Sequence, residues 1–296
     1  MSIIELHCHT YYSDGRPSPG EVVESAAALG LRYLAITDHD SAHGSREARG
    51  LASQKDIRLI PAIEFTTRWD EAEMPAGESD VDLLGYFIDL ESPAFLQAEG
   101  DGLTDFTERM RIWCGLLTQS GCSLSLEDVF AQNPRHPGTL QLVQAVLARG
   151  YAASWGAADA LVRTCIHAIP PCARTIEVAV SVIHAAGGAA VLAHPAPRYL
   201  RWNGSRLGAA GLRRLVEIGL DGIEVFHPSL TGLDRAHFLE LAGQFNLAVC
   251  GGSDEHGWEE GSSSLGSQPV SEAMLEALAA RAQSGAPISP AESRKS

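Results

Sequence analysis

Two histidines near the start of this chain have a spacing that suits metal ligands. They are His7 and His9 in the segment ELHCHT, residues 5–10. If this segment is a β-strand, the two imidazoles point to one face and Cys8 points to the other, because side chains alternate along a strand. Three interpretations compete: a zinc knot that includes Cys8, a packed pair without chemistry, and one wall of a metal site completed from far along the chain.

Other candidate ligands stand where further strands are expected to end. The positions are Asp38-His39-Asp40, Glu64, His194, His227 and the pair Asp254 and His256. Six of the 11 histidines fall at such strand ends, and polar side chains of this kind are poorly tolerated as packing inside a barrel. We therefore favour a metal site built from several strands. Imidazole and carboxylate without thiolate suit Mn²⁺, Zn²⁺ or Fe²⁺, and paired ions of this kind support displacement at phosphorus.

The elements that would position these residues alternate between strand and helix. Ser18 and Pro19 predict the start of a helix, and Gly30 predicts its end. Strands are expected at residues 3–9, 31–37, 57–63, 81–87, 189–194, 221–227 and 247–254. Helices between the strands predict parallel β-α units with right-handed crossovers. About seven strands in this order favour an α/β barrel, in which chemistry gathers at the carboxyl ends of the strands.

The pattern changes between residues 93 and 173, where helical periodicity replaces the strand signals. Helices are expected at residues 104–119, 126–132, 139–150 and about 157–162. We interpret residues 93–173 as a helical insert that covers the barrel mouth. Residues 1–92 and 174–286 would then form the barrel, and residues 287–296 a loose C-terminal tail.

Composition excludes several classes of protein. With 296 residues and 45% hydrophobic content, the chain can bury a full core. Its net charge of −15 argues against a broad electrostatic grip on long nucleic acid, although bound cations still permit a small anion. The six cysteines form no C-x-x-C pair, and no secretory or membrane-spanning segment is evident. We expect a cytoplasmic protein with no membrane partner.

Five segments follow one another in a recognisable order: ELHCHTYYSDG, LAITDHDS, PAIEFTT, VLAHP and GGSDEH. Together they resemble the motifs of the PHP (polymerase and histidinol phosphatase) superfamily of metal-dependent phosphoesterases. The resemblance covers about residues 1–90 and 175–257, and implies a distorted (β/α)7 TIM-like barrel. The NPRHPG stretch in the insert resembles a subgroup that removes the 3′-phosphate from 3′,5′-nucleoside bisphosphates. Some members of that subgroup trim RNA from the 5′ end.

The resemblance also implies two or three divalent ions, with Mn²⁺ expected first and Zn²⁺ or Fe²⁺ as alternatives. One ion would be held by His7, His9, Glu64 and Asp254. Another would be held by Asp14, His39 and His256. Glu64 would bridge two ions, and His194 would complete the site beside it. Two departures from the family pattern stand out: Asp14 and Asp82 each occupy a position where relatives usually have a histidine.

The expected reaction is hydrolysis of a phosphomonoester, giving a 5′-nucleotide such as AMP plus phosphate. A metal-bridging hydroxide held by Glu64 and Asp254 would attack phosphorus, and His194 or His227 would protonate the leaving oxygen. An arginine fork suits a second phosphate. The candidate substrate contacts are Arg135, His136, Arg198, Arg201 and His227.

Other functions remain as alternatives. Histidinol phosphate, or the 5′ ends of short RNA, would keep the chemistry and change the substrate. An amidohydrolase shares the H-x-H motif but often uses a modified lysine, and neither Lys55 nor Lys295 ends an expected strand. A non-catalytic PHP module would have lost ligands, whereas this chain retains an almost complete set.

Overall fold

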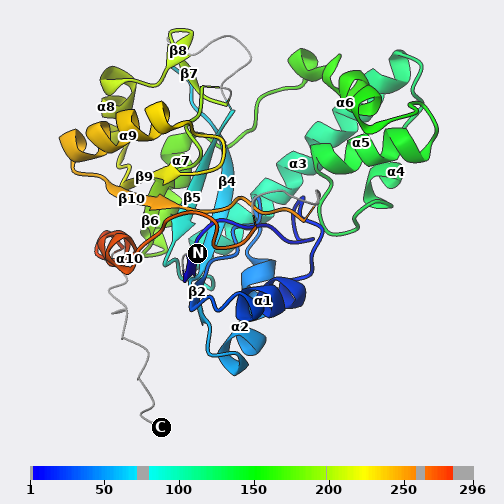
Figure 1. Ribbon diagram of the computed structural model, residues 1–296. Helices are drawn as coiled ribbons and strands as arrows, with labels where there is room; N and C mark the ends of the chain where they lie inside the picture. The colour runs from blue at the N-terminus through cyan, green and yellow to red at the C-terminus, as the bar shows by residue number, and fades with distance from the viewer. Residues whose placement is uncertain (1–2, 72–79, 198, 258–263, 283–296) are drawn as a thin grey trace.

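The computed structural model describes residues 3–71, 80–197, 199–257 and 264–282. Its fold is mixed α/β, as predicted, with two sheets lying together and a group of helices projecting to one side (Figure 1). None of the helices in these residues is long and apolar enough to cross a membrane.

The first sheet consists of three short parallel strands, β1 (Ile4–Glu5), β2 (Tyr33–Leu34) and β3 (Arg58–Leu59). Between them run the helices α1 (Pro19–Ala28) and α2 (His43–Gln54). The predicted start of α1 is confirmed by a capping box. The Ser18 hydroxyl accepts a hydrogen bond from Glu21 N, and the Glu21 carboxylate accepts one from Ser18 N. Gly30, with φ of 74°, lets the chain turn after the helix.

The second sheet has five strands in the order β10-β9-β6-β5-β4. In chain order they are β4 (Ala62–Arg68), β5 (Asp80–Tyr86), β6 (Ala189–Leu192), β9 (Gly222–Phe226) and β10 (Ala248–Gly251). The expectation of parallel strands throughout is wrong at β5, which runs antiparallel to β4 and β6. Arg68 pairs with Asp80 across β4 and β5, so the chain reverses direction between these two strands.

The predicted strand over residues 57–63 is divided between the two sheets. Pro61 lies between β3 and β4. Proline has no N–H to donate to a strand ladder, so the strand is interrupted there. Within the described ranges the strands pair as separate sheets, joined by single bridges from Cys8 to Glu255 and from His39 to Glu64. Both bridges lie in segments that carry predicted ligands.

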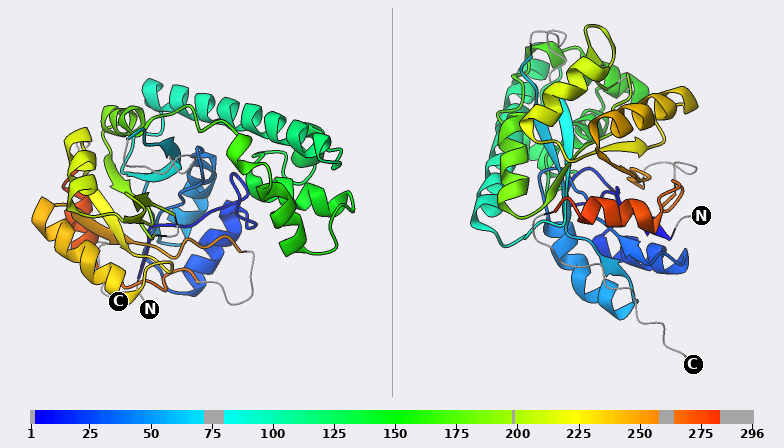
Figure 2. Two further views of the ribbon diagram at one scale, coloured as in Figure 1. Left: turned by 90° about the horizontal axis from the view of Figure 1, so that it is seen from above. Right: turned by 90° about the vertical axis from the view of Figure 1, so that its left-hand side faces the viewer.

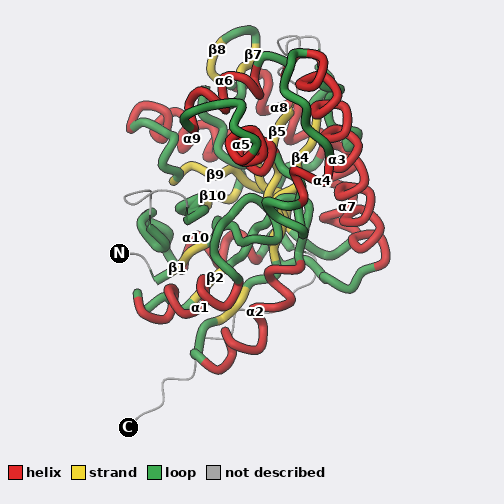
Figure 3. The backbone as a smooth tube through the Cα atoms, turned by 90° about the vertical axis from the view of Figure 1, so that its right-hand side faces the viewer, coloured by secondary structure: helices red, strands yellow, loops and turns green. Residues whose placement is uncertain are grey.

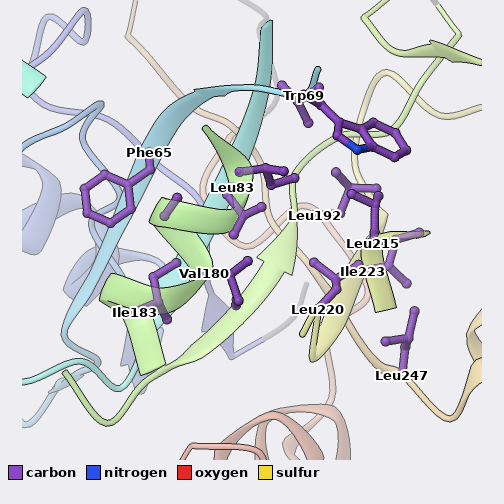
Figure 4. Close-up of a cluster of buried hydrophobic side chains, with 14 of the residues drawn as sticks. Phe65, Trp69, Leu83, Val180, Ile183, Leu192, Leu215, Leu220, Ile223 and Leu247 are labelled. Atoms are coloured by element: carbon purple, nitrogen blue, oxygen red, sulfur yellow. The ribbon is translucent and has the colours of Figure 1, made fainter. Parts of the chain in front are cut away.

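Four further helices and a small hairpin complete this part of the molecule. They are α7 (Ile176–Ala185), the hairpin β7 (Arg201–Trp202) and β8 (Ser205–Arg206), α8 (Ala209–Ile218), α9 (Gly232–Phe245) and α10 (Glu272–Ala279). The largest hydrophobic core lies where α7 and α8 pack on the second sheet (Figure 4). Phe65 and Leu83 from the sheet and Ile183 from α7 are fully buried in it. This packing holds the strand ends in place.

Residues 93–173 contain only helices among the regular elements. They are α3 (Pro93–Gln119), α4 (Leu126–Phe130), α5 (Thr139–Ala148), α6 (Trp155–Arg163) and the 3-10 turn η1 (Ile166–Ala168). The long helix α3 runs from the sheets into this helical group (Figure 2). Figure 3 looks onto the group, with α5 toward the viewer. The helical group has a hydrophobic core of its own, which includes Trp113, Leu142 and Val162.

Helix α3 begins at Pro93, well before the predicted start at Thr104. Gly100 and Gly102 weaken the helical pattern in the sequence, because glycine is a poor helix former. Gly102 has a packing role: a Cβ there would lie 2.7 Å from Arg174 Nη2 and 2.9 Å from Asp40 Cβ. Tertiary packing therefore overrides local propensity in this stretch.

Candidate metal centre

The segment that carries the histidine pair lies against the end of β10. Asp254 N donates to His7 O at 2.8 Å, and His9 N donates to Glu255 O at 2.9 Å. Cys8 faces the other way, where its buried Sγ donates to Ala35 O at 3.3 Å. The alternation expected for a strand is therefore present, and the thiol lies away from the imidazoles.

Glu64, on β4, is the carboxylate at the middle of the cluster. Its Oε2 is 3.3 Å from His7 Nε2, 3.2 Å from His9 Nε2 and 3.5 Å from His39 Nε2. Its Oε1 is 2.9 Å from His194 Nε2. One fully buried carboxylate thus faces four imidazoles, an arrangement suited to a ligand shared between ions.

Asp254, beyond the end of β10, faces four imidazoles, one of which is His256, whose Nδ1 is 3.6 Å from Asp254 Oδ1. The same Oδ1 is 3.3 Å from His7 Nε2 and 3.1 Å from His9 Nε2, and Asp254 Oδ2 is 3.1 Å from His227 Nε2. His227 lies directly beyond β9. Neighbouring strand ends therefore contribute to a single group of side chains.

Asp14, in the loop before α1, closes another side of the cluster. Its Oδ1 is 3.2 Å from His256 Nε2 and 3.6 Å from His9 Nδ1, and its Oδ2 is 4.0 Å from His39 Nε2. Asp82, on β5, is more distant, with Oδ2 3.8 Å from His194 Nε2. Both carboxylates that depart from the family pattern thus reach the cluster.

Four overlapping groups of side chains have ligand atoms close enough to hold a metal ion. They are His9, Asp14, His39 and His256; His7, His227 and Asp254; His7, His9 and Glu64; and His39, Glu64 and Asp82. The groups contain every predicted ligand except His194, which contacts Glu64, and they add His227. Within the described part of the chain, His9 Nε2 is buried without an aligned hydrogen-bond partner, although two carboxylates lie near it. A buried imidazole nitrogen without a hydrogen-bond partner is suited to act as a metal ligand.

Carboxylates of the cluster stabilise the charged forms of His39 and His194, whereas the carboxyl group of Asp82 is shifted toward its neutral form. Burial by itself lowers the pKa of the His39 imidazole, but Glu64 and Asp14 outweigh burial and raise that pKa to about 9. Burial also lowers the pKa of the His194 imidazole, but Glu64 outweighs burial and raises that pKa to about 9. Burial and the nearby Glu64 raise the pKa of Asp82 to about 6. Divalent ions would replace protons as the positive charges in such a cluster.

Two of the site residues have backbone conformations that side chains rarely adopt. His194 has φ of 23° and Asp254 has φ of 55°. Such left-handed conformations cost free energy in residues other than glycine, and they concentrate at functional sites. Here they turn the chain immediately beyond β6 and β10, where the side chains enter the cluster.

A family model for the PHP domain matches residues 5–154, about half of the chain. This chain belongs to the PHP-domain family. A solved structure of a candidate metal-dependent phosphoesterase from Bifidobacterium adolescentis has a TM-score of 0.81 and 27% identity, covering 94% of this chain and 96% of the other. The described fold is therefore that of a PHP protein.

Several characterised PHP relatives are similar over most of the chain. The phosphoribosyl 1,2-cyclic phosphate 1,2-diphosphodiesterase of Eggerthella lenta is 31% identical, covering 86% of this chain and 94% of the relative. The 5′-3′ exoribonuclease Rnm of Escherichia coli is 31% identical, covering 86% and 85%. The 3′,5′-nucleoside bisphosphate phosphatase of Chromobacterium violaceum is 28% identical, covering 90% and 91%. This PHP protein is a hydrolase of phosphate esters that uses divalent metal ions.

Glu224 is a buried carboxylate of the PHP site that the sequence interpretation missed. Its Oε1 is 2.9 Å from His7 Nδ1, and its Oε2 accepts a hydrogen bond from His194 N at 2.8 Å. Through these contacts it orients the His7 imidazole and anchors the backbone of His194, and the Nε2 atoms of both residues face Glu64. The available signal was a charged residue within the apolar strand segment DGIEVFH.

Two further buried carboxylates organise the loops around the PHP site. Glu5 accepts hydrogen bonds from His7 N and Ser253 N at 2.9 Å and from Gly266 N at 2.7 Å. Asp38 accepts from Thr10 N at 2.6 Å and from Thr10 Oγ1 at 2.7 Å. Neither Glu5 nor Asp38 has to bind a metal ion to do this. They fix the backbone that carries the ligands.

The predicted substrate contacts lie in different places. His227 and His136 are buried at the site, and burial lowers the pKa of His136 to about 4. The Arg135 guanidinium lies 4.0 Å from the centre of the Tyr11 ring and lines a neighbouring cavity of about 740 Å³. Arg201 is exposed on β7, where its Nε donates to Pro197 O. Arg198 lies outside the described residues.

A cavity of about 240 Å³ opens directly beside the ligand cluster. Asp14, His39 and Asp82 form one wall. Residues of the helical part, among them Arg109 and His136, line the same cavity. A phosphate ester in this cavity would lie between the metal ligands and the helices of residues 93–173.

Proposed function

We propose that this PHP enzyme hydrolyses the 3′-phosphate of 3′,5′-nucleoside bisphosphates, giving a 5′-nucleotide such as AMP plus phosphate. The observation that carries the proposal is the cavity shared by the ligand cluster and the helical segment 93–173. A small organic phosphate fits such a space better than a long polymer. The similarity to the bisphosphate phosphatase of Chromobacterium violaceum, over 90% of this chain, supports the same substrate.

We further propose that the two sheets belong to one distorted (β/α)7 barrel formed by residues 1–92 and 174–286. The bridges from Cys8 to Glu255 and from His39 to Glu64 support this arrangement, because they join the sheets on the side of the ligands. Residues 93–173 would be an insert over the barrel mouth. The proposed tail at residues 287–296 lies outside the described residues.

The proposed ligands divide the cluster between two or three ions, with Mn²⁺ preferred and Zn²⁺ or Fe²⁺ as alternatives. The set is His7, His9, Asp14, His39, Glu64, Asp82, His194, Asp254 and His256. Bound divalent ions would supply an activated water and neutralise charge on the phosphoryl group. The protein's part is to place carboxylates and imidazoles around that group and to shield it from bulk water.

The leaving oxygen of the substrate needs a proton, and two imidazoles are candidates to donate it. His194 Nε2 lies 2.9 Å from Glu64 Oε1, and His227 Nε2 lies 3.1 Å from Asp254 Oδ2. The His227 Nδ1 is 2.7 Å from Ser229 Oγ, which holds the ring in one orientation. Only an imidazole nitrogen that holds no ion can carry that proton and pass it to the leaving oxygen, and His227, unlike His194, lies outside the proposed ligand set.

The test is a panel of phosphate esters assayed for phosphate release with Mn²⁺, Zn²⁺ and Mg²⁺ in turn. It should contain 3′,5′-nucleoside bisphosphates, mononucleotides, histidinol phosphate and short 5′-phosphorylated RNA. We expect the bisphosphates to have the highest kcat/KM and the 5′-phosphate to survive in the product. Faster turnover of histidinol phosphate, or no turnover of any ester in metal-loaded protein, would contradict the proposal.

A second candidate function is 5′-3′ exonuclease activity on short RNA. The relative Rnm from Escherichia coli, which bears that name, covers 86% of this chain. The neighbouring cavity of about 740 Å³, with Arg135 stacked on Tyr11, offers room for a further nucleotide. Release of mononucleotides from a 5′-phosphorylated trimer, followed by chromatography, distinguishes this activity from phosphate release.

A further inference from the structure

Arg109 occupies the place that the sequence interpretation gave to other arginines. Arg135 lines a different cavity, and Arg201 is exposed on β7. Arg109, on α3, lines the cavity beside the ligand cluster, and it is the only arginine from the described residues to do so. Its side chain is 14% exposed. A mostly buried guanidinium thus lines the same small cavity as Asp14, His39 and Asp82.

The guanidinium of Arg109 is fixed at one end and lacks a partner at the other. Nη2 donates to Asp80 Oδ2, on β5, at 2.8 Å. Nε is buried and has no hydrogen-bond partner within the described part of the chain. A buried donor without an acceptor is costly, so such groups are rare unless a ligand or water completes them. The fixed end pre-orients the fork for that ligand.

The charges around Arg109 identify the kind of ligand. The cavity is lined by three carboxylates, from Asp14, Asp80 and Asp82, which by themselves repel an anion. Divalent ions held by the cluster would reverse this balance and leave the guanidinium facing a positively charged site. The bound ions and the guanidinium would both attract an anion with several oxygen atoms. Arginine forks match phosphoryl oxygens particularly well.

We propose that Arg109 binds a phosphoryl oxygen of the substrate in this cavity. The proposal rests on the proposed phosphatase function, because the phosphate ester is the anion that the cavity would receive. Arg109 is then a substrate-binding residue that reaches the site from α3. The helical segment 93–173 would contribute directly to phosphate recognition and not only cover the site.

The test compares Arg109→Gln and Arg109→Lys with two controls on Mn²⁺-loaded protein. Arg111→Gln removes an exposed arginine two residues away on the same helix, where it pairs with Glu108. Asp80→Asn breaks the ion pair but keeps the guanidinium. Two quantities are measured: the rise in thermal midpoint caused by inorganic phosphate, from which its Kd follows, and kcat and KM for a 3′,5′-nucleoside bisphosphate.

We expect Arg109→Gln to weaken phosphate binding by about 10- to 100-fold, as the loss of a charged hydrogen bond does. Arg109→Lys should recover part of this loss, since it keeps the charge without the fork. Arg111→Gln should bind phosphate within about threefold of the parent protein. Asp80→Asn, which removes the orienting carboxylate but keeps the guanidinium, should weaken phosphate binding less than Arg109→Gln does. Phosphate-free midpoints and circular dichroism establish that each variant is folded.

Two results would overturn the proposal. One is unchanged phosphate affinity in folded Arg109→Gln; the other is equal weakening in Asp80→Asn, which would assign the effect to the ion pair as a structural link. The binding measurement needs no turnover. If the parent protein binds phosphate through Arg109 but hydrolyses no ester, the proposed function fails while this inference stands.

Discussion

The histidines of the metal centre are held in place by carboxylates that need not contact an ion. Glu224 faces His7 Nδ1, so it fixes the direction in which His7 Nε2 points, and it accepts a hydrogen bond from the backbone N–H of His194. Histidine ligands in other metalloproteins also have such partners, because an imidazole that is already correctly oriented binds the ion without a further loss of conformational entropy. The site therefore extends beyond its proposed ligands.

Replacing Glu224 should weaken metal binding while leaving every proposed ligand in place. Glu224→Gln loses the negative charge that His7 Nδ1 faces, and we expect metal affinity to fall by about 10- to 100-fold. Titration of metal-free protein with Mn²⁺ measures the change. Glu217→Gln, on the exposed surface of α8, is the matched control. Equal affinity in the two variants would contradict the assigned role.

Replacing a proposed ligand should have a larger effect than replacing its partner. His9→Ala and Asp254→Ala should each lower turnover by more than about 100-fold, because each removes a donor from overlapping groups. The bound metal, counted by elemental analysis, should fall by at least one ion per chain. His167→Ala, in the exposed turn η1, should change neither quantity. Normal activity in His9→Ala or Asp254→Ala would remove that residue from the ligand set.

Close contact between the ends of strands explains why two segments distant in sequence share one site. Gly252 follows β10 and packs on the backbone of His7, where a Cβ would lie 2.2 Å from His7 Cβ and 2.6 Å from His7 N. Only glycine allows this approach. The Asp254 N to His7 O hydrogen bond lies immediately beside it.

Gly252→Ala should therefore separate the two segments. We expect a loss of about 1 to 3 kcal/mol in the free energy of unfolding, because the added methyl group meets backbone that has little freedom to move. Urea unfolding measures this loss. Gly243→Ala, on α9, has no atom within 4 Å of the added Cβ and should be neutral or slightly stabilising. A stability as high as the parent's in Gly252→Ala would contradict this account.

At the scale of the whole molecule, the net charge of −15 is concentrated partly in the metal centre. Glu64, Asp254 and Asp14 lie within a few ångströms of the same imidazoles. In the metal-free protein, protonated imidazoles must offset these carboxylates. Bound divalent ions would do so more strongly and would join both sheets.

Removal of metal should consequently destabilise the entire fold as well as abolish turnover. Ligand binding stabilises a protein by about 2.7 kcal/mol when the ligand is present at 100 times its Kd. We expect the thermal midpoint to fall after chelation and to recover when Mn²⁺ is added. Mn²⁺ should shift the midpoint much less in Asp254→Ala. An identical shift in that variant would show that the ions bind elsewhere.

The alternation of strands and helices, the helix after Ser18 and the recurrence of histidine and carboxylate at strand ends were all predictable from the sequence. Each depends on local rules: periodicity, capping and the order of motifs. The full length of α3 was not predictable, because Gly100 and Gly102 obscured it. Nor was the antiparallel course of β5, since a strand's direction depends on its neighbours.

The sequence by itself indicated which side chains could bind metal, because residue type, strand alternation and the order of the family motifs point to a few positions. Only the tertiary structure decided which carboxylates support them and which arginine faces the cavity. Glu224 and Arg109 lie far along the chain from His7, so no local spacing relates them. Their roles depend on distances between elements, which arise from the packing of the whole chain.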